Sequence, residues 1–287
     1  MTVRLMTIKL WVAIPDSTLI ECVDLMEKTV KAGYIARACA IHRVNRIYIY
    51  HDKKERARAD QRLLSILLQY IETPQYLRRH LFPKMPELAY AGMLPPLRIP
   101  SHQVETELSE VKVGDLREGY CYRRAGTYYV DVGLSKPAQL QSNEVNLGRV
   151  LVRIERTEPE LACTIADKSA IKGYWGFTVK QTEELTKLIK SLKPVLVLAT
   201  SREGQPVAEN LGRLQELLSS HERCLILFGS PRRGLKEILQ EEGATLHNVA
   251  HMTLNFVPEQ GTATVRTEEA LYIVLGIINL LMHIPKD

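Results

Sequence analysis

Residues 224–239 read "CLILFGSPRRGLKEIL", and this stretch decides the fold. Four apolar residues, Leu225 to Phe228, lead into a turn with two glycines and two arginines, and a helical pattern follows Gly234. A strand that breaks at glycine and re-enters a helix is how α/β proteins present backbone N–H groups to an anionic or polar ligand. The stretch therefore predicts an α/β domain with a ligand-binding loop.

The α/β pattern continues on both sides of this stretch. Apolar residues at helical spacing and short β-rich runs alternate along the chain. The predicted elements of the first part are a strand at 7–15, a helix at 19–33 that ends at Gly33, a strand at 46–52 and a helix at 55–74. Those of the last part are helices at 181–192, 210–221 and 234–243, strands at 194–204 and 251–261, and a final helix from about Thr267.

A different pattern occupies residues 93–168. Three prolines fall within "GMLPPLRIPSH", and beyond them short alternating runs at 118–124, 126–133, 148–156 and 161–167 replace the helical period. Such runs fit a small barrel of the OB type better than a sandwich. We expect one α/β domain with a parallel sheet, residues 1–92 and 169–287, interrupted by an inserted OB-like barrel, residues 93–168.

Composition excludes several classes of protein. The five cysteines include no C-x-x-C pair, which argues against a zinc ribbon and a disulfide scaffold and favours a cytoplasmic location. The longest apolar run, residues 270–282, is shorter than the roughly 20 residues of a membrane-spanning helix. The eight histidines form no pattern typical of a metal site, so we expect no metal and no membrane partner.

Positive charge is concentrated in one segment. Residues 31–84 hold twelve Lys and Arg against four Asp and Glu, a balance of +8 that leaves −3 for the rest of a chain with net charge +5. A basic segment on a near-neutral protein suggests a polyanionic partner. On charge alone, an ordinary solvated face is equally consistent.

The glycine turn matches neither of two familiar phosphate loops. A Walker A loop needs lysine after its second glycine, and Leu235 follows Gly234 here. A Rossmann fingerprint needs a middle glycine where Pro231 stands. Both readings fail, and the two glycines by themselves are also consistent with ordinary turns.

Three loops of the last part end predicted strands with polar or glycine-rich sequence: "ATSREG" (199–204), "FGSPRRG" (228–234) and "NFVPEQGTATVRTEE" (255–269). Ligands of open parallel sheets bind beyond the carboxyl ends of the strands, so we expect one pocket. Thr267 can cap the final helix, and Glu268 and Glu269 could either support this cap or accept a substrate proton. The rest of this helix is apolar nearly all round, which predicts burial by the fold or by a second subunit.

Three stretches resemble, in order, the motifs of the SPOUT class of S-adenosylmethionine-dependent RNA methyltransferases, named for SpoU and TrmD. They are "GYIARACAIHRVNRIYIY" (33–50), "LILFGSPRRGL" (225–235) and "NFVPEQGTATVRTEEALYIVLGIIN" (255–279). With "LFPKMPELAYAGMLPPL" (81–97) ahead of the β insert, they are similar to the archaeal and eukaryotic branch that carries an inserted OB-like domain. The resemblance spans nearly the whole chain.

The resemblance implies a fold and a cofactor. The fold would be a SPOUT-type parallel sheet with a C-terminal trefoil knot, which no sequence pattern derives by itself, and a homodimer packed through the C-terminal helix. Three loops would bind S-adenosyl-L-methionine, largely through backbone groups, and its sulfonium needs no metal to activate the methyl group. The implied cofactor-binding residues are Thr200, Ser201, Arg202, Phe228, Gly229, Gly234, Asn255, Val257, Gln260, Gly261, Thr264, Val265 and Thr267.

The resemblance also implies contacts with RNA. Arg37 matches the arginine of the first motif and would be the catalytic residue that contacts RNA and orients the reacting group, although a plain surface arginine is the alternative. Strand alternation allows only one of Tyr128 and Tyr129 to face outward. The implied RNA-binding residues, each of which alone is also typical of a solvated surface, are Arg43, Arg46, Lys53, Lys54, Arg123, Arg124 and Tyr128.

Two departures from the SpoU-type motifs bear on the activity. The second motif has "SPRRG" where many of those enzymes have Glu, and the third has "RTEE" where they have Ser-Leu-Asn. These differences make 2′-O-ribose methylation doubtful. Base methylation is at least as well supported, and the eukaryotic relatives suggest N3 of uridine in ribosomal RNA. A non-catalytic RNA-binding or ribosome-assembly protein on a SPOUT scaffold stays open as the alternative.

Overall fold

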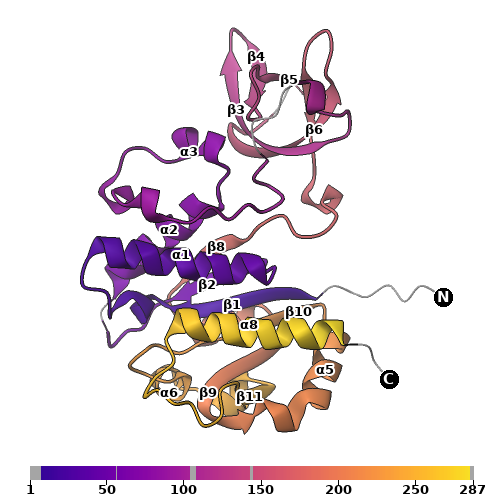
Figure 1. Ribbon diagram of the computed structural model, residues 1–287. Helices are drawn as coiled ribbons and strands as arrows, with labels where there is room; N and C mark the ends of the chain where they lie inside the picture. Colours follow the sequence, from indigo (N-terminus) through magenta and orange to yellow (C-terminus); the bar gives the residue numbers. More distant parts are fainter. Residues whose placement is uncertain (1–7, 56, 104–107, 143–144, 285–287) are drawn as a thin grey trace, which may run out of the picture. The chain divides into compact units, whose positions relative to one another are not determined.

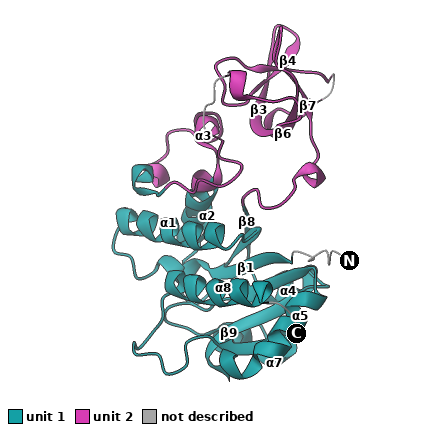
Figure 2. Cartoon of the chain, turned by 45° about the vertical axis from the view of Figure 1, so that its right-hand side comes forward, with its two compact units in different colours: residues 1–69, 90–95, 177–287 teal, residues 70–89, 96–176 magenta. Residues whose placement is uncertain are grey.

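The computed structural model describes residues 8–55, 57–103, 108–142 and 145–284. The chain divides into two compact units (Figure 2). The first unit contains residues 1–69, 90–95 and 177–287, and the second contains residues 70–89 and 96–176.

The first unit is built on a parallel sheet. Among the described residues the sheet has six strands in the order β11-β9-β10-β1-β2-β8, and every neighbouring pair is parallel. The strands are β1 (Lys9–Pro15), β2 (Arg46–Tyr50), β8 (Thr178–Thr182), β9 (Leu196–Pro206), β10 (Arg223–Leu227) and β11 (Met252–Asn255). The predicted α/β fold with a parallel sheet is confirmed, while the trefoil knot stays a prediction.

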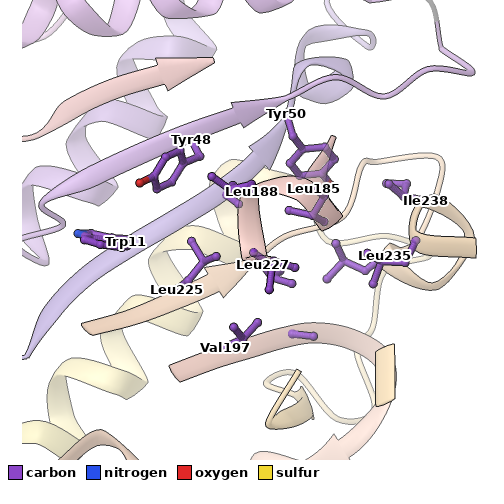
Figure 3. Packing of buried hydrophobic residues seen from close by; sticks show 14 of the residues in the cluster. Trp11, Tyr48, Tyr50, Leu185, Leu188, Val197, Leu225, Leu227, Leu235 and Ile238 are labelled. Carbon is purple, nitrogen blue, oxygen red and sulfur yellow. The ribbon is translucent and has the colours of Figure 1, made fainter. Parts of the chain in front are cut away.

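Helices cover both faces of this sheet. On one face, alternate strand residues pack against α4 (Leu185–Ser191) and α6 (Leu235–Glu241) (Figure 3). The intervening strand residues, such as Val12 and Ile49, are fully buried on the other side of the sheet. Here α1 (Leu25–Ile41) and α8 (Thr267–His283) lie next to each other (Figure 1). The other α-helices of the described residues are α2 (Arg58–Glu72), α3 (Gln75–Leu81), α5 (Leu211–Ser220) and α7 (Leu246–Val249).

The first predicted helix has the wrong limits. The chain forms a short 3-10 turn at Asp16–Leu19, and α1 begins only after Asp24, whose side chain accepts a hydrogen bond from the Glu27 backbone at 2.8 Å. Nor does α1 end at Gly33. A Cβ atom at Gly33 would lie 2.7 Å from Cδ of Pro95, so this glycine allows close packing inside the helix instead of ending it.

The final helix is buried along one side only. Its buried residues include Leu271, Val274 and Ile278, whereas the Leu280 side chain is 60% exposed. The fold of one copy of the chain therefore does not bury this helix on every side. No helix in the described part of the chain is long and apolar enough to cross a membrane.

The second unit contains a closed β barrel. Within its described residues, five strands close in the order β3-β4-β5-β7-β6, and β5 pairs with β7 in parallel while the other pairs are antiparallel. The strands are β3 (Leu116–Arg124), β4 (Thr127–Asp131), β5 (Ala138–Leu140), β6 (Gly148–Arg156) and β7 (Ala162–Ile165). The predicted small β barrel is confirmed, with β5 as a strand that the sequence pattern does not indicate.

The burial of the cysteines gives a test of the packing of both units. Cys39, Cys121, Cys163 and Cys224 are buried and only Cys22 is partly exposed. Burial raises the pKa of all five thiols, that of Cys163 to about 12, and thus disfavours the reactive thiolate. We expect iodoacetamide to modify Cys22 well before the others, as read by peptide mass spectrometry, and all five after unfolding in guanidinium. Rapid modification of Cys121 in the native protein would contradict the closed barrel.

Candidate functional site

A cavity of about 550 Å³ lies at the carboxyl ends of β9, β10 and β11. Its walls come from the segments around Thr200–Glu203, Phe228–Glu237 and Leu254–Val265, and from the first turns of α8. These are the three segments that the sequence predicts to share a pocket, but the first of them, residues 199–204, is part of strand β9 and not a loop. Their strands are adjacent in the sheet, which explains why segments far apart in sequence meet here.

Most of the predicted cofactor-binding residues line this cavity. They are Thr200, Ser201, Arg202, Phe228, Gly229, Gly234, Asn255, Gln260, Thr264, Val265 and Thr267. Val257 and Gly261 belong to the third loop but are not among the lining residues. The role of all these residues in binding a cofactor stays a prediction.

The loop at residues 229–234 is a turn closed by hydrogen bonds between Ser230 and Arg233. Ser230 organises it, since its backbone N–H donates to the Arg233 carbonyl at 2.9 Å and its Oγ accepts from the Arg233 N–H at 3.0 Å. A Cβ atom at Gly229 would lie 3.1 Å from the Arg233 carbonyl oxygen and 3.2 Å from the Leu235 nitrogen. A side chain at Gly229 would therefore press on the backbone of the loop, and the glycine leaves backbone groups next to the cavity.

Side-chain hydrogen bonds join the segment 199–204 to the loop that follows β11. Asn255 Nδ2 donates to the Arg202 carbonyl at 3.0 Å, and Asn255 Oδ1 accepts from the Val257 N–H at 2.9 Å. Gln260 Nε2 donates to the Thr262 carbonyl at 2.9 Å. Both amides therefore support the shape of the third loop, as expected of turn chemistry, and they do so at the cavity wall.

Three neighbouring residues at the start of α8, Thr267, Glu268 and Glu269, have different contacts. Glu269 caps the helix, because its Oε2 accepts from the Arg266 backbone N–H at 2.8 Å. Glu268 instead forms an ion pair with buried Lys31 of α1 at 3.2 Å. The predicted cap by Thr267 is wrong: this residue is the first of the helix, is 3% exposed, and its Oγ1 has no hydrogen-bond partner within the described residues.

The cavity fits S-adenosylmethionine in size and in its bonding groups. Its volume falls within the roughly 300–1,000 Å³ of small-molecule sites. Leu235, Val265 and Val274 give it apolar walls, which suit an adenine ring. The unpartnered Thr267 hydroxyl, buried in the wall, needs a hydrogen-bond partner that a polar ligand would supply. No group of three or more His, Cys, Asp or Glu in the described residues could hold a metal ion.

Sequence reasoning did not single out several lining residues. Among them are Phe256, next to Asn255, and Ala270 and Val274 of α8. Thr267, Ala270 and Val274 are spaced i, i+3 and i+7, which places them on one face of the helix. This helical spacing from Thr267 is the signal in the sequence that could have identified Ala270 and Val274.

Arg37 is half-buried on α1 and does not line the cavity. Its positive charge acts on Tyr272 of α8, where burial raises the pKa of the hydroxyl and the arginine opposes this rise. Arg37 is therefore held at the side of α1 that faces α8.

The predicted RNA-binding residues of the first unit differ in their surroundings. Arg43 is exposed, with a positive φ of 58°. The Arg46 guanidinium lies 5.0 Å from the ring centre of Trp11 and donates to the Tyr48 hydroxyl at 3.0 Å, so the fold already uses it. Lys53 pairs with Glu184 at 2.8 Å and Lys54 with Glu241 at 2.7 Å. Their contact with RNA stays a prediction.

The barrel residues lie near a second cavity of about 570 Å³. Its lining includes Arg123, whose guanidinium lies 5.5 Å from the ring centre of Tyr128. Tyr128 packs against the barrel core, whereas Tyr129 stacks on Tyr122 with ring centres 6.2 Å apart. Arg124 is exposed at the β3–β4 turn. The tyrosines thus point to opposite sides, as alternation requires.

A family model described as "Putative RNA methyltransferase" matches residues 9–278. The chain belongs to this family of RNA methyltransferases. This match confirms the resemblance noted in the sequence.

The chain is also similar to individual proteins. An uncharacterised protein of Haloarcula marismortui is 32% identical over 284 residues, covering 94% of this chain and 98% of the relative. The human 28S rRNA (uridine-N(3))-methyltransferase is 29% identical, covering 93% of this chain and 77% of the relative. The solved SpoU methyltransferase AviRb from Streptomyces viridochromogenes, in complex with AdoMet, has a TM-score of 0.36 and 8% identity; this likeness covers 97% of the chain and 58% of that structure.

Proposed function

We propose that this protein transfers a methyl group from S-adenosylmethionine to a base of ribosomal RNA, namely N3 of a uridine. The observation that carries the proposal is the cavity at the ends of β9, β10 and β11, in a chain that belongs to an RNA methyltransferase family. The human relative is named for this reaction on 28S rRNA. The five free cysteines agree with a cytoplasmic location.

The residues of the site would bind and orient the reactants. S-adenosylmethionine, when bound, supplies a sulfonium whose methyl group is already activated. The backbone of the Gly229 loop and the Thr267 hydroxyl would hold the cofactor, and the apolar residues Leu235, Val265 and Val274 would enclose its adenine. Arg37 would hold the RNA so that the target base meets the methyl group.

Basic side chains in both units would bind the RNA. Arg43, Lys53 and Lys54 carry positive charge near the surface of the first unit, and Arg123 and Arg124 do so on the barrel. Such side chains hold phosphates and make affinity depend on salt. The cavity lined by Arg123 and Tyr128 has an arginine and one aromatic ring, the two kinds of group on which unpaired bases stack.

Cofactor binding tests this proposal directly. The purified protein would be titrated by calorimetry with S-adenosylmethionine and S-adenosylhomocysteine, with ATP and NAD as controls. Methyl transfer from labelled cofactor to unmodified ribosomal RNA would follow, with mass spectrometry of the digested RNA to identify 3-methyluridine. Saturable binding and transfer support the enzyme. Folded protein, free of carried-over ligand, that binds neither compound would favour the alternative of a non-catalytic RNA-binding protein.

Replacing Arg37 should separate binding from transfer. Because Arg37 lies outside the cavity lining, we expect Arg37→Ala to leave the Kd for S-adenosylmethionine within about twofold and to lower methyl transfer by about 100-fold or more, as for loss of one transition-state contact. Lys28→Gln, on the same helix and paired with Asp60, is the matched control. Transfer at wild-type rate by Arg37→Ala would remove this residue from the reaction.

We also propose a homodimer packed through α8. Leu280 is 60% exposed on this helix, and Tyr34 and Ile41 of α1 are 53% and 51% exposed on the neighbouring helix. Exposed apolar side chains on two neighbouring helices offer a surface for such a contact.

Leu280→Lys should weaken this dimer by about 30-fold or more, since it would bury a charge at a contact worth about 2 kcal/mol. Sedimentation velocity at several protein concentrations measures the effect. Ile165→Lys, an exposed apolar residue of the barrel, is the control and should leave the assembly unchanged. A wild-type protein that sediments as a monomer at all concentrations would exclude the dimer.

A further inference from the structure

We propose that Asp52 is a positioning residue that holds the loop 229–234 in its binding shape through Arg233. Asp52 follows the end of β2 and Arg233 belongs to the cavity wall, 181 residues further along the chain. The proposal rests on the proposed function, because it takes the cavity to be the S-adenosylmethionine site. It concerns how the chain fixes the wall of that site.

The contact between the two residues is largely shielded from water. The Arg233 side chain is 10% exposed and that of Asp52 is 1% exposed, and Arg233 Nη1 donates to Asp52 Oδ1. The other guanidinium nitrogen, Nη2, lies 2.6 Å from Glu241 of α6. A charge-assisted contact in such surroundings is stronger than one in water, and a buried carboxylate without its partner would be costly. Asp52 is therefore able to fix the position of Arg233.

Asp52 is itself held from behind. Its Oδ2 accepts from the Ser17 hydroxyl at 3.0 Å, and its backbone N–H donates to Asp16 Oδ1 at 2.9 Å. Asp16 is fully buried after β1, and its second carboxylate oxygen contacts Nδ1 of His51. Residues that follow β1 and β2 thus form one hydrogen-bonded group that supports Asp52, the partner of Arg233.

The same strand also holds the other end of the loop. The hydroxyl of Tyr50, the last residue of β2, donates to the carbonyl of Phe228 at 2.7 Å (Tyr50 is labelled in Figure 3). Burial raises the pKa of this hydroxyl, which keeps it a donor at neutral pH. Phe228 precedes Gly229, so Tyr50 fixes the entry of the loop while Asp52 fixes Arg233 near its exit.

Further ion pairs join the segment after β2 to the same loop and to α6. Glu55 lies 3.7 Å from Arg232, and Lys54 pairs with Glu241, the carboxylate that Arg233 also contacts. These contacts are more exposed, and exposed pairs contribute little each. The buried Asp52–Arg233 contact is therefore the one whose loss should free the loop.

Asp52→Asn tests the proposal with little change of shape. We expect the Kd for S-adenosylmethionine to rise about tenfold or more, which is the size of effect that residues in direct contact have on each other. Hydrogen exchange of the amides in 229–234 should become faster, and more so than that of the strand amides of the same sheet. Glu183→Gln is the matched control, because it breaks a carboxylate–arginine contact with Arg58 that is exposed and does not involve the loop. Ser17→Ala is the milder second variant, should Asp52→Asn fail to fold, and should shift both readouts in the same direction by less.

The two readouts separate the proposals. If the wild-type protein binds S-adenosylmethionine and both Asp52→Asn and Ser17→Ala bind it equally well, the positioning role is wrong while the proposed function stands. If the wild-type protein binds no cofactor, the proposed function fails, and unchanged exchange of the 229–234 amides in the variants would overturn the positioning role independently.

Discussion

Gly229→Val should weaken cofactor binding strongly while the protein stays folded. The new side chain would push against backbone atoms, since even a Cβ atom would lie 3.1 Å from the Arg233 carbonyl oxygen and 3.4 Å from the Gly234 Cα. Backbone of this turn cannot rotate aside as a flexible side chain would. Overpacking costs about 1–3 kcal/mol, and we place this substitution at the upper end, a rise of about 100-fold in the Kd for S-adenosylmethionine.

Calorimetric titration measures the effect, and a second glycine supplies the control. Gly212 lies in α5, where an added Cβ meets nothing within 4 Å, so Gly212→Val should bind the cofactor as the wild type does. Equal affinity of the two variants would mean that the loop 229–234 is not part of the cofactor site. Loss of binding in both would point to a general loss of structure, which circular dichroism would detect.

The sequence predicts the order of the elements better than their limits. The buried strands β1 and β10 and the buried first part of β9 are found because they are short apolar runs, whereas the polar second part of β9 reads as a loop. The edge strand β8 reads "TVKQT", has one apolar residue and is mostly exposed, so no apolar pattern indicates it. Gly33 reads as a helix end from local sequence alone. Only the tertiary contact with Pro95 explains a glycine inside the helix.

The site could be predicted as far as the loops that form it. Glycine and polar residues after buried strands identify the loops, and the common edge of a parallel sheet brings them together. The partner of Arg233 could not be predicted in this way. Asp52 is 181 residues away, and an acidic residue after a strand is as typical of an ordinary turn as of a buried ion pair. Side-chain pairing over such distances depends on strand order, which local patterns do not encode.

Arg149→Met should destabilise the second unit strongly. Arg149 on β6 bonds two carboxylates: its Nε donates to Glu118 at 3.0 Å and its Nη1 to Glu72 at 2.8 Å. Both glutamates are 8% exposed. Removing the arginine leaves two buried carboxylates without their cation, and breaking a buried pair in this way costs about 3–5 kcal/mol. Urea unfolding followed by the fluorescence of Trp175, whose Nε1 donates to Glu118 at 2.8 Å, measures the loss.

The pH dependence of this variant distinguishes lost charge pairing from lost packing. Burial raises the pKa of Glu72 to about 7 from its ordinary 4.5, and Arg149 opposes the rise. Without Arg149 the pKa of Glu72 in the folded state should rise further. Between pH 4.5 and this raised pKa, the folded variant therefore binds more protons than the unfolded chain. Its stability is then greatest below about pH 4.5 and falls as pH increases through 7. We therefore expect Arg149→Met to regain more stability between pH 8 and pH 5 than the wild type or Arg153→Met, on the same strand, because both of these keep Arg149. A loss that is equal at both pH values would mean that packing, and not the pairing of Glu72 and Glu118, holds this part of the unit together.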